Sequence, residues 1–393
     1  VYWEGESNTT FLRVPIYNKT LSDLKSSPTP EEDKPKTNSV KVDKIKIDIN
    51  VDENLVHIDS QEQKIRLKIG DFKKSQNKPY DFKMIVLVHS ARSYKKRRDT
   101  IRATWAKGHG NVFFMVGKHC PFKPEQRKWG KWNCVLKDEL KNKPMSDIID
   151  EDYIREQEKL TEQLSKEENV ILLDMIDVYR HTSMKLRHGW LWALKNTNAD
   201  YIVKTDDDAF ARVDSLEHWL MNRKKHEYEG ISHHWAGGTK HRGGKWGERK
   251  YKKGSSATYP PWPAGPGWLF SRPVIEYFAT HQDSYVDYQG EDTAVGIWMN
   301  RIKSELTIKL STSQHFHVHS GDCHNRNYFM VGHNISPQKM RDCFKTLDEF
   351  PAALKWKSSQ KCECGHGDPD LNSKECLCKC ERCYSGKRCE IAN

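Results

Sequence analysis

The 393-residue sequence lacks a long apolar run. Near the first predicted strand, the longest uninterrupted one is Met84–Val88, far shorter than the roughly 20 residues that a membrane-spanning helix needs. The chain also begins at Val1 without an initiator Met, so no signal peptide or anchor can be identified in it. We therefore expect contact with a membrane only through an N-terminal anchor that is missing from this chain.

Helix-turn-helix, RRM and zinc-finger patterns are also absent from the sequence. Their absence matters because the net charge of +11 and the pI near 8.9 would otherwise suit a nucleic acid. We therefore expect no nucleic-acid partner. The positive charge instead favours another anion, such as a nucleotide, an acidic glycan or a membrane surface.

Cysteine is abundant, since the chain has 11. Such a count in clustered positions favours an oxidising compartment. Three N-glycosylation triplets agree with that setting, at Asn8, Asn18 and Asn334. Cys120 and Cys134 are predicted to form a local disulfide, and Cys323 is predicted to pair with Cys343.

Residues 358–393 hold the other seven cysteines in a short polar tail that loosely resembles an EGF-type module. The tail has almost no apolar residues, so only cross-links could order it. Zinc is the alternative to disulfides, because Cys380 and Cys383 have Cys-x-x-Cys spacing. The secretory setting favours disulfides.

The rest of the chain divides into two parts. Residues 1–78 are polar and rich in Lys, Asp, Ser and Pro, which predicts a stem or linker. Residues 79–350 alternate apolar strands with amphipathic helices, apart from an insertion at 118–168. The predicted strands are 84–88, 112–116, 170–173 and 201–203, and the intervening helices are 93–105 and 184–196. This order predicts an α/β domain with a mostly parallel sheet covered by helices on both faces.

Three carboxylates, Asp206, Asp207 and Asp208, follow the predicted strand Tyr201–Val203. Like charges this close need a cation or wide solvation to stay ionised. A divalent ion such as Mg²⁺ or Mn²⁺ would supply that cation and would bring a substrate phosphate with it. The alternative is a solvated acidic turn. A helix should follow, with Asp214 and Glu217 as its capping box.

Three further stretches could serve a site or only the fold. Prolines, glycines and aromatic rings alternate in residues 259–270, which suits a sugar-binding loop, although core packing explains Trp268 equally well. Glu291 and Asp292 precede an apolar helix, where Asp292 is either a helix cap or a carboxylate held in a cleft. His315, His317 and His319 alternate, so they could share a zinc ion if they lie on one face of a strand.

Six segments between about residues 82 and 347 resemble the β-1,3-glycosyltransferase family that includes the animal β-1,3-galactosyltransferases and β-1,3-N-acetylglucosaminyltransferases. They are Arg97–Trp105 (RRDTIRATW), Asp177–Lys185 (DVYRHTSMK), Lys204–Phe210 (KTDDDAF), Tyr259–Gly267 (YPPWPAGPG), Glu291–Gly296 (EDTAVG) and Val331–Met340 (VGHNISPQKM). One such block would be weak, whereas six in the right order are a specific signal.

The resemblance implies a GT-A fold, which is a nucleotide-binding α/β sandwich. It also implies a UDP-sugar donor, a divalent metal that is usually Mn²⁺, and a β-1,3 linkage made with inversion. Galactose is the preferred sugar, with an N-acetylhexosamine as the alternative, and the acceptor is a glycan on protein or lipid. The enzyme would work in the Golgi or another secretory lumen as a single-pass type II membrane protein.

The resemblance also assigns roles to residues. Asp208 and His333 would bind the metal, and Asp292 would be the general base. The UDP-sugar would be bound by Arg98, Arg102, Asp177, Lys185, Lys204, Asp206 and Asp207. The acceptor and donor sugars would meet Trp262, Gly265, Gly267, Trp268 and Glu291. Because Asn334 adjoins His333, its glycosylation triplet is predicted to be unused.

Two other functions fit parts of the sequence. A catalytically inactive glycan-binding protein would suit the basic composition and the Cys-rich tail, but it would need neither metal ligands nor a base. A metal-dependent phosphohydrolase would use the three aspartates, but the sequence shows no clear phosphate loop for one.

Overall fold

The computed structural model describes residues 74, 78–239, 246–248, 250–251, 258–263, 265–319, 323–325 and 327–348, together with the backbone of short strands at 49–50, 55–56, 367–369, 378–380, 384–385 and 391–392. Most of the predicted stem, its glycosylation triplets at Asn8 and Asn18, and the predicted disulfides of the tail lie outside the described residues. The division into three parts therefore stays a prediction.

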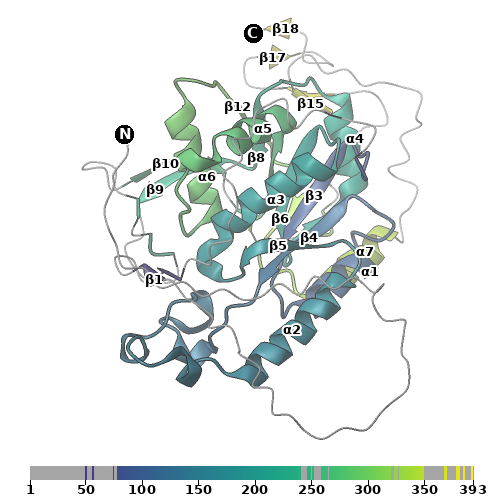
Figure 1. Cartoon of the computed structure of the whole chain (residues 1–393). Coiled ribbons are helices and arrows are strands. Elements are labelled where there is room, and N and C mark those ends of the chain that lie inside the picture. The colour runs from purple at the N-terminus through teal and green to yellow at the C-terminus, as the bar shows by residue number, and fades with distance from the viewer. Residues whose placement is uncertain are drawn as a thin grey trace, which may run out of the picture.

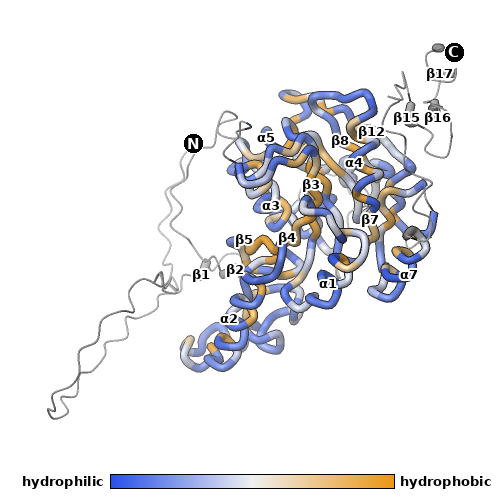
Figure 2. The backbone as a smooth tube through the Cα atoms, turned by 90° about the vertical axis from the view of Figure 1, so that its right-hand side faces the viewer, coloured by the Kyte–Doolittle hydropathy of each residue, from blue (hydrophilic) through white to orange (hydrophobic). Residues whose placement is uncertain are grey.

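A seven-stranded sheet forms the centre, in the order β12-β8-β11-β6-β3-β4-β5. Its strands are β3 (Met84–His89), β4 (Val112–Lys118), β5 (Val170–Ile176), β6 (Tyr201–Asp206), β8 (Glu229–Ser232), β11 (Trp268–Ser271) and β12 (Lys309–Thr312). Only β11 runs antiparallel to its neighbours in this sheet. Strands β3, β4 and β6 are buried except for the last residue of β4 and of β6, as their continuous apolar sequences predict, and Figure 2 shows β3 as a hydrophobic segment.

Helices cover both faces of this sheet (Figure 1). One core contains side chains of α3 (Thr182–Asn196), α5 (Arg272–Thr280) and α6 (Glu291–Ile302). The other contains side chains of α1 (Lys95–Ala103), α4 (Val213–Asn222) and α7 (Pro337–Asp348). The predicted α/β sandwich with a mostly parallel sheet is confirmed.

The insertion between β4 and β5 folds as a small unit with its own core. It contains η2 (Pro124–Gln126), η3 (Gly130–Trp132), η4 (Asp138–Leu140), η5 (Met145–Asp147) and α2 (Glu151–Ser165). The predicted disulfide Cys120–Cys134 is present, and both cysteines are buried in that core. The core also includes Val178, which follows β5, so the insertion is packed against the domain at the end of that strand.

Smaller elements complete the fold. They are β1 (Ile49–Asn50), β2 (Leu55–Val56), η6 (Tyr179–His181), β7 (Phe210–Ala211), β9 (Trp235–Thr239), β10 (Thr258–Pro263), η7 (Gln282–Ser284), β13 (Phe316–His317), β14 (Met330–Val331), β15 (Gly367–Pro369), β16 (Cys378–Cys380), β17 (Tyr384–Ser385) and β18 (Ile391–Ala392). Strands β13, β14 and β7 form a separate sheet. Among the described helices, none is both long and apolar enough to cross a bilayer.

The predicted capping box at Asp214 and Glu217 is wrong. Helix α4 begins at Val213 after Arg212, and no side chain caps its first turn. The chain pairs through β7 with β14 just before this helix, so sheet pairing rather than a capping side chain positions the start of α4.

Candidate functional site

The candidate site lies at the carboxyl ends of β3 and β6. These strands are parallel neighbours, and their last residues, His89 and Asp206, are paired in register. Open α/β sheets bind their ligands at this edge. His89 was not predicted from the sequence as a site residue, because nothing in its own strand marks it. Burial, reinforced by the charge of Lys204, lowers the pKa of His89 well below its usual value, so the ring is neutral.

Lys204 connects two of the predicted acidic segments. Its Nζ lies 2.9 Å from Asp206 Oδ1 and 2.8 Å from Glu291 Oε1, and its side chain is only 1% exposed. Burial would raise the pKa of Glu291, but the Lys204 ammonium outweighs it and lowers that pKa to about 2. Asp206 responds in the opposite direction, because burial and the Glu291 charge raise its pKa to about 6.

Asp207 is held by two partners on the first segment of the domain. Arg97 Nη1 donates to its Oδ1 at 2.6 Å, and the Ser90 hydroxyl donates to its Oδ2 at 2.8 Å. Its side chain is 5% exposed. Each of its oxygens thus has a partner, and Asp207 positions the Arg97 guanidinium. Arg97 also lies 3.5 Å from Asp208 Oδ2.

Asp208 lies beside the late histidine segment. Strand β7 pairs antiparallel with β14, with Phe210 opposite Val331, and continuing this register by two residues places His333 opposite Asp208. The backbone confirms this proximity, because the Ile335 amide donates to the Asp208 carbonyl at 2.9 Å. His333 and Asn334 both adopt left-handed backbone conformations, with φ of 56°, which turn the chain immediately after the strand.

The His333 ring is arranged as a metal ligand would be. Its Nδ1 lies 2.6 Å from the Val318 carbonyl, so Nδ1 carries a proton and Nε2 is the ring nitrogen that would bind a metal. Histidines that bind metals usually have such a second hydrogen bond. The donor set of one imidazole and one carboxylate, from His333 and Asp208, suits a divalent ion such as Mn²⁺.

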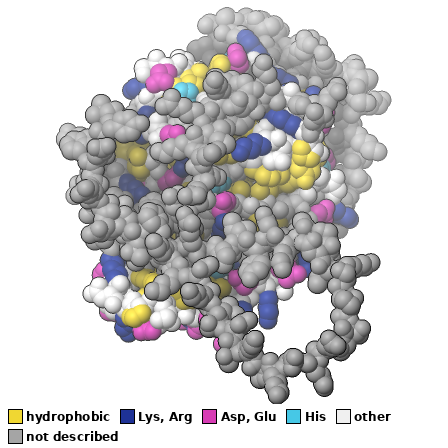
Figure 3. Space-filling model, in the orientation of Figure 1, with side chains coloured by type: hydrophobic (Ala, Val, Ile, Leu, Met, Phe, Trp, Pro, Cys, Tyr) yellow, Lys and Arg dark blue, Asp and Glu magenta, His cyan; other side chains and the backbone are white. Residues whose placement is uncertain are grey.

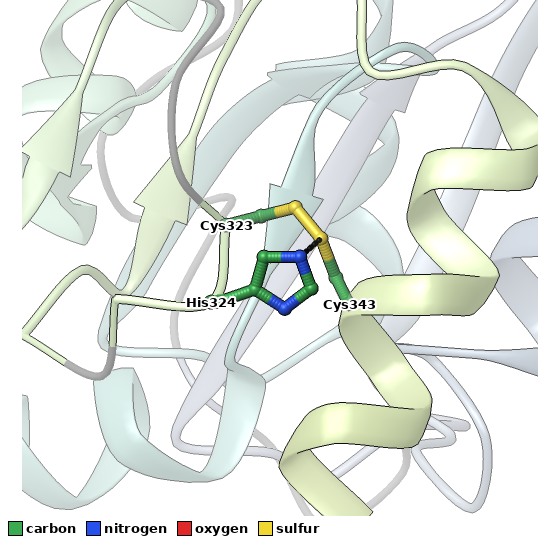
Figure 4. A group of neighbouring side chains, drawn as sticks. All are labelled: Cys323, His324 and Cys343. Atoms are coloured by element: carbon green, nitrogen blue, oxygen red, sulfur yellow. Dashed lines mark hydrogen bonds between the residues drawn. A yellow bond between two sulfur atoms is a disulfide. The ribbon is translucent and has the colours of Figure 1, made fainter.

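Two other groups of possible metal ligands occur among the described residues. His89, Asp206 and Glu291 lie close together, but Lys204 already bridges the two carboxylates, so an ammonium supplies the cation there. Cys323, His324 and Cys343 form the second group (Figure 4). The two sulfurs are joined in the predicted disulfide, which is confirmed, so they are not thiolate ligands.

Asp292 lies in the first turn of α6, directly after Glu291. Its Oδ1 accepts a hydrogen bond from the Thr293 amide at 2.6 Å, while Gly290 rather than Asp292 is the N-cap. Burial and the neighbouring Glu291 charge raise the pKa of Asp292 to about 7. A carboxylate with such a pKa can accept a proton near neutral pH.

Asp177 and Lys185 form a buried ion pair, with 2.5 Å between Lys185 Nζ and Asp177 Oδ1 and only 6% of each side chain exposed. Lys185 also donates to the Ser90 carbonyl at 2.7 Å, and the Gly117 amide donates to Asp177 at 3.0 Å. The pair therefore connects the ends of β3, β4 and β5 and supports Ser90, which holds Asp207.

The placement of Arg98 and Arg102 does not support their predicted nucleotide-binding role. Arg98 is fully buried and makes a two-pronged contact with Glu167. Arg102 bonds Glu167 and the Glu168 carbonyl, and it lines a 280 Å³ pocket beside Val112, at the amino end of β4. The helix face that carries both residues is turned toward the end of the insertion, and Arg97 contacts the aspartates instead.

Within the aromatic loop, Trp268 is fully buried in β11, with its ring against Trp190. A sugar cannot reach it, so its predicted role in sugar binding is corrected to core packing. Gly265, at φ +83°, would place a Cβ 2.4 Å from Val318, and Gly267 would place one 2.3 Å from Met330. Both glycines thus allow the loop to pack against the segments that carry His333. Trp262 is partly exposed on β10.

The predicted grouping of His315, His317 and His319 around zinc is not found. His315 is buried, with its Nδ1 2.6 Å from the Asn327 carbonyl and its ring stacked on Phe329. The His317 ring stacks instead on Tyr328. No group of metal ligands in the described part of the chain includes all three histidines.

Charge on the face shown in Figure 3 is mixed. Lys and Arg side chains lie interspersed with Asp and Glu side chains over the described residues there. Among the described side chains on that face, no broad basic surface is visible.

Comparison with known proteins finds related sequences. Residues 146–309 match the family described as Galactosyltransferase. A zebrafish (Danio rerio) protein named UDP-GalNAc:beta-1,3-N-acetylgalactosaminyltransferase 2 is 30% identical over 170 residues, which are 42% of this chain and 33% of that protein. The chain thus spans about a third of that relative's length.

More distant relatives match over longer stretches. The Arabidopsis thaliana Beta-1,3-galactosyltransferase GALT1 is 25% identical over 69% of this chain and 38% of that protein. A Rattus norvegicus UDP-GalNAc:beta-1,3-N-acetylgalactosaminyltransferase 1 is 23% identical over 68% of this chain and 73% of that protein. A solved galactosyltransferase LgtC structure covers 67% of this chain and 95% of its own at 10% identity, but the TM-score of 0.28 is too low to support an argument.

Proposed function

We propose that this protein transfers a sugar from a UDP-sugar to the 3-hydroxyl of an acceptor glycan on protein or lipid, because residues 146–309 match the Galactosyltransferase family and the similar proteins are named as β-1,3-glycosyltransferases. The new linkage is β-1,3 and forms with inversion. The observation that carries the proposal is that the backbone segments of Asp208 and His333 lie beside one another, directly after β6, whose Lys204 is ion-paired with Glu291, the neighbour of Asp292.

Asp208 and His333 would hold a divalent cation, most simply Mn²⁺. Such an ion stabilises the negative charge that develops on a departing diphosphate. The chain's own part is to fix these two ligands. Arg97 lies 3.5 Å from Asp208, and the Val318 carbonyl fixes the His333 tautomer. Ligands held in this way do not need to reorganise when the donor binds.

Asp292 would be the general base. The acceptor hydroxyl has a high pKa, so its proton must be removed as the new bond forms, and a positioned carboxylate contributes about 10² to 10⁴-fold to such a step. The raised pKa of Asp292, about 7, suits this role at neutral pH. A single base that activates the acceptor opposite the leaving group gives inversion, without a second nucleophilic carboxylate.

Lys204 would keep the base in the right state. It neutralises Glu291, so Glu291 stays ionised while the adjacent Asp292 becomes the group that exchanges a proton. Asp206 and Asp207 then serve as anchors for Lys204 and Arg97. We infer that they position the nucleotide site indirectly, through these two cations.

The donor is galactose or N-acetylgalactosamine in this proposal. Galactose was the preference from the sequence, whereas the names of the zebrafish and rat relatives specify N-acetylgalactosamine. The two disulfides of the described domain favour the lumen of the secretory pathway. A Golgi location with a type II anchor remains the expectation from the family resemblance.

A transfer assay with purified protein tests the proposal. UDP-galactose and UDP-N-acetylgalactosamine are each incubated with a panel of acceptor oligosaccharides, with Mn²⁺ or with EDTA. We expect a β-1,3-linked product with one of the donors and no product with EDTA. A protein that binds the oligosaccharides but forms no product with any of these donors would be the inactive glycan-binding protein instead.

A further inference from the structure

The described domain exposes two tryptophan side chains strongly, and both are linked to consecutive residues of one short helix. Trp129 is 49% exposed and Trp246 is 61% exposed. The Arg180 guanidinium lies over the Trp129 ring at 4.5 Å from its centroid. The indole of Trp246 hydrogen-bonds the Tyr179 side chain. The segments that carry Trp129 and Trp246, which are far apart in the sequence, therefore meet at η6.

A third tryptophan lies in the same place. Trp132, at the end of η3, is partly exposed, and its ring centroid lies 6.5 Å from that of Tyr179. Helix η3 belongs to the insertion, whose own core includes Val178 immediately before η6. The disulfide Cys120–Cys134 closes the loop that carries both Trp129 and Trp132. These two rings are thus held firmly beside η6.

The backbone at Trp129 is unusual. Its φ of 59° lies in the left-handed region, which bulky side chains rarely adopt. Such conformations cost energy and cluster at ligand sites, where the surrounding structure enforces them. Here the strained residue is one that leaves half of its indole in water.

This aromatic surface adjoins the acidic residues of the candidate site. The Thr182 hydroxyl, just after η6, donates to the Gln289 carbonyl at 2.6 Å, two residues before Glu291. The Ser183 hydroxyl donates to the Tyr288 carbonyl. Burial, with the charges of Glu291, Asp292 and Asp206, raises the pKa of Tyr179 to about 12. Tyr179 is thus in contact with Trp246 and Trp132, and it also feels the charges of the acidic residues of the site.

The geometry points to an extended acceptor subsite in which Trp129, Trp132 and Trp246 receive a sugar ring of the acceptor glycan beyond the ring that reacts. This inference rests on the proposed transferase function and gives a role to the insertion. Indole rings bury the apolar C–H face of a pyranose, while its hydroxyls stay in water or meet polar groups at the edge. On this inference, the preferred acceptor is at least a disaccharide, and the insertion contacts the sugar ring that does not react.

The test compares Trp129→Ala and Trp246→Ala with Leu310→Ala, which removes another exposed apolar side chain, on strand β12. UDP-galactose and UDP-N-acetylgalactosamine serve as donors. The acceptors are methyl β-glycosides of galactose, N-acetylglucosamine and N-acetylgalactosamine. Each acceptor is tested as the monosaccharide and as a β-linked disaccharide. We expect kcat/KM for the best disaccharide to fall about tenfold or more in each tryptophan variant, with little change for the monosaccharide. Trp129→Tyr should restore much of the loss, and Leu310→Ala should behave as wild type.

An equal loss for monosaccharide and disaccharide, or no loss for either, would overturn the subsite while leaving the transferase activity intact. Absence of any wild-type transfer would count against the proposed function itself. In that case, saturation-transfer NMR with the same disaccharides in the presence of UDP decides the subsite. Signals that are present for wild type and lost in Trp129→Ala support it, and signals that are absent or unchanged contradict it.

Discussion

Lys204 Nζ lies within 2.9 Å of Asp206 and 2.8 Å of Glu291, so one buried ammonium joins the end of β6 to the start of α6. Three acids, Asp206, Glu291 and Asp292, are gathered around this single cation. Their pKa values diverge, with Glu291 lowered and Asp206 and Asp292 raised. Such divergence separates the group that stays ionised from the group that can exchange a proton.

Replacement of Lys204 by Met should strongly destabilise the domain. It leaves Asp206 and Glu291 without their shared partner, and the loss of one partner from a buried pair costs about 3 kcal/mol or more. Chemical denaturation of Lys204→Met measures this loss. Lys95→Met, which breaks an exposed pair with Asp99, is the control and should leave stability nearly unchanged. Equal stability of the two variants would show that Lys204 is not the electrostatic centre of the site.

Asp208→Asn and His333→Ala should each remove the cation-dependent part of UDP binding. The wild-type melting temperature should rise with UDP and Mn²⁺ together, because a ligand that binds only the folded state stabilises it. Both variants should fold normally and lose that rise. His324→Ala removes a histidine that lies beside the Cys323–Cys343 disulfide and should keep the rise. A full response to UDP and Mn²⁺ in His333→Ala would remove His333 from the metal site.

Asp292→Asn should abolish transfer while preserving the binding of UDP. The expected fall in kcat is about 10² to 10⁴-fold. The wild-type rate should rise with pH and level off above about pH 7, since Asp292 must lose its proton to act as a base. Initial rates across pH 5.5–9, together with UDP titrations by calorimetry, measure both effects. Loss of UDP binding in this variant would show that Asp292 binds the UDP-sugar donor instead of acting as the general base.

The same substitution should change stability in a pH-dependent way. The pKa of Asp292 is about 7 in the folded protein and about 3.9 in an unfolded chain. As the pH rises, the unfolded state therefore releases this proton first, and the free energy of unfolding of the wild type falls between about pH 4 and pH 7. Asp292→Asn should thus be more stable than wild type above pH 7, and the difference should shrink toward pH 4. A difference that grows as the pH falls would contradict the raised pKa.

Arg98→Lys should lower stability without changing the KM for the UDP-sugar. Lys cannot reproduce the two-pronged contact with Glu167 in a fully buried position. Arg97→Lys should raise the KM for the UDP-sugar and leave stability nearly unchanged, since Arg97 contacts Asp207 and Asp208. Denaturation midpoints and donor KM values for both variants separate these roles. A raised donor KM in Arg98→Lys would restore the original assignment of that residue.

The sequence predicted the strands, the covering helices and the acidic segments, because each has a local signature of apolar runs followed by charged residues. It could not predict which arginine faces the site. Arg98 and Arg102 share a helix face, as their spacing indicates, but Glu167, which lies in no recognisable motif, draws that face away. His89 was missed for a similar reason, since only its register with Asp206 brings it to the site.

Trp268 shows the same limit in the loop. Its neighbours Gly265 and Gly267 resemble those of a sugar-binding loop, yet Trp268 opens β11, an antiparallel strand inside the main sheet. No pattern within the loop marks this strand as a central one. The strongly exposed tryptophans of the described residues lie instead at Trp129 in the insertion and at Trp246.

Anomalous diffraction at the manganese edge, from crystals grown with UDP and Mn²⁺, tests the central claim most directly. We predict one strong peak within about 2.0–2.3 Å of an Asp208 carboxylate oxygen and of His333 Nε2. A peak between Asp206 and Glu291 with Lys204 displaced, or a metal bound without Asp208 and His333, would contradict it.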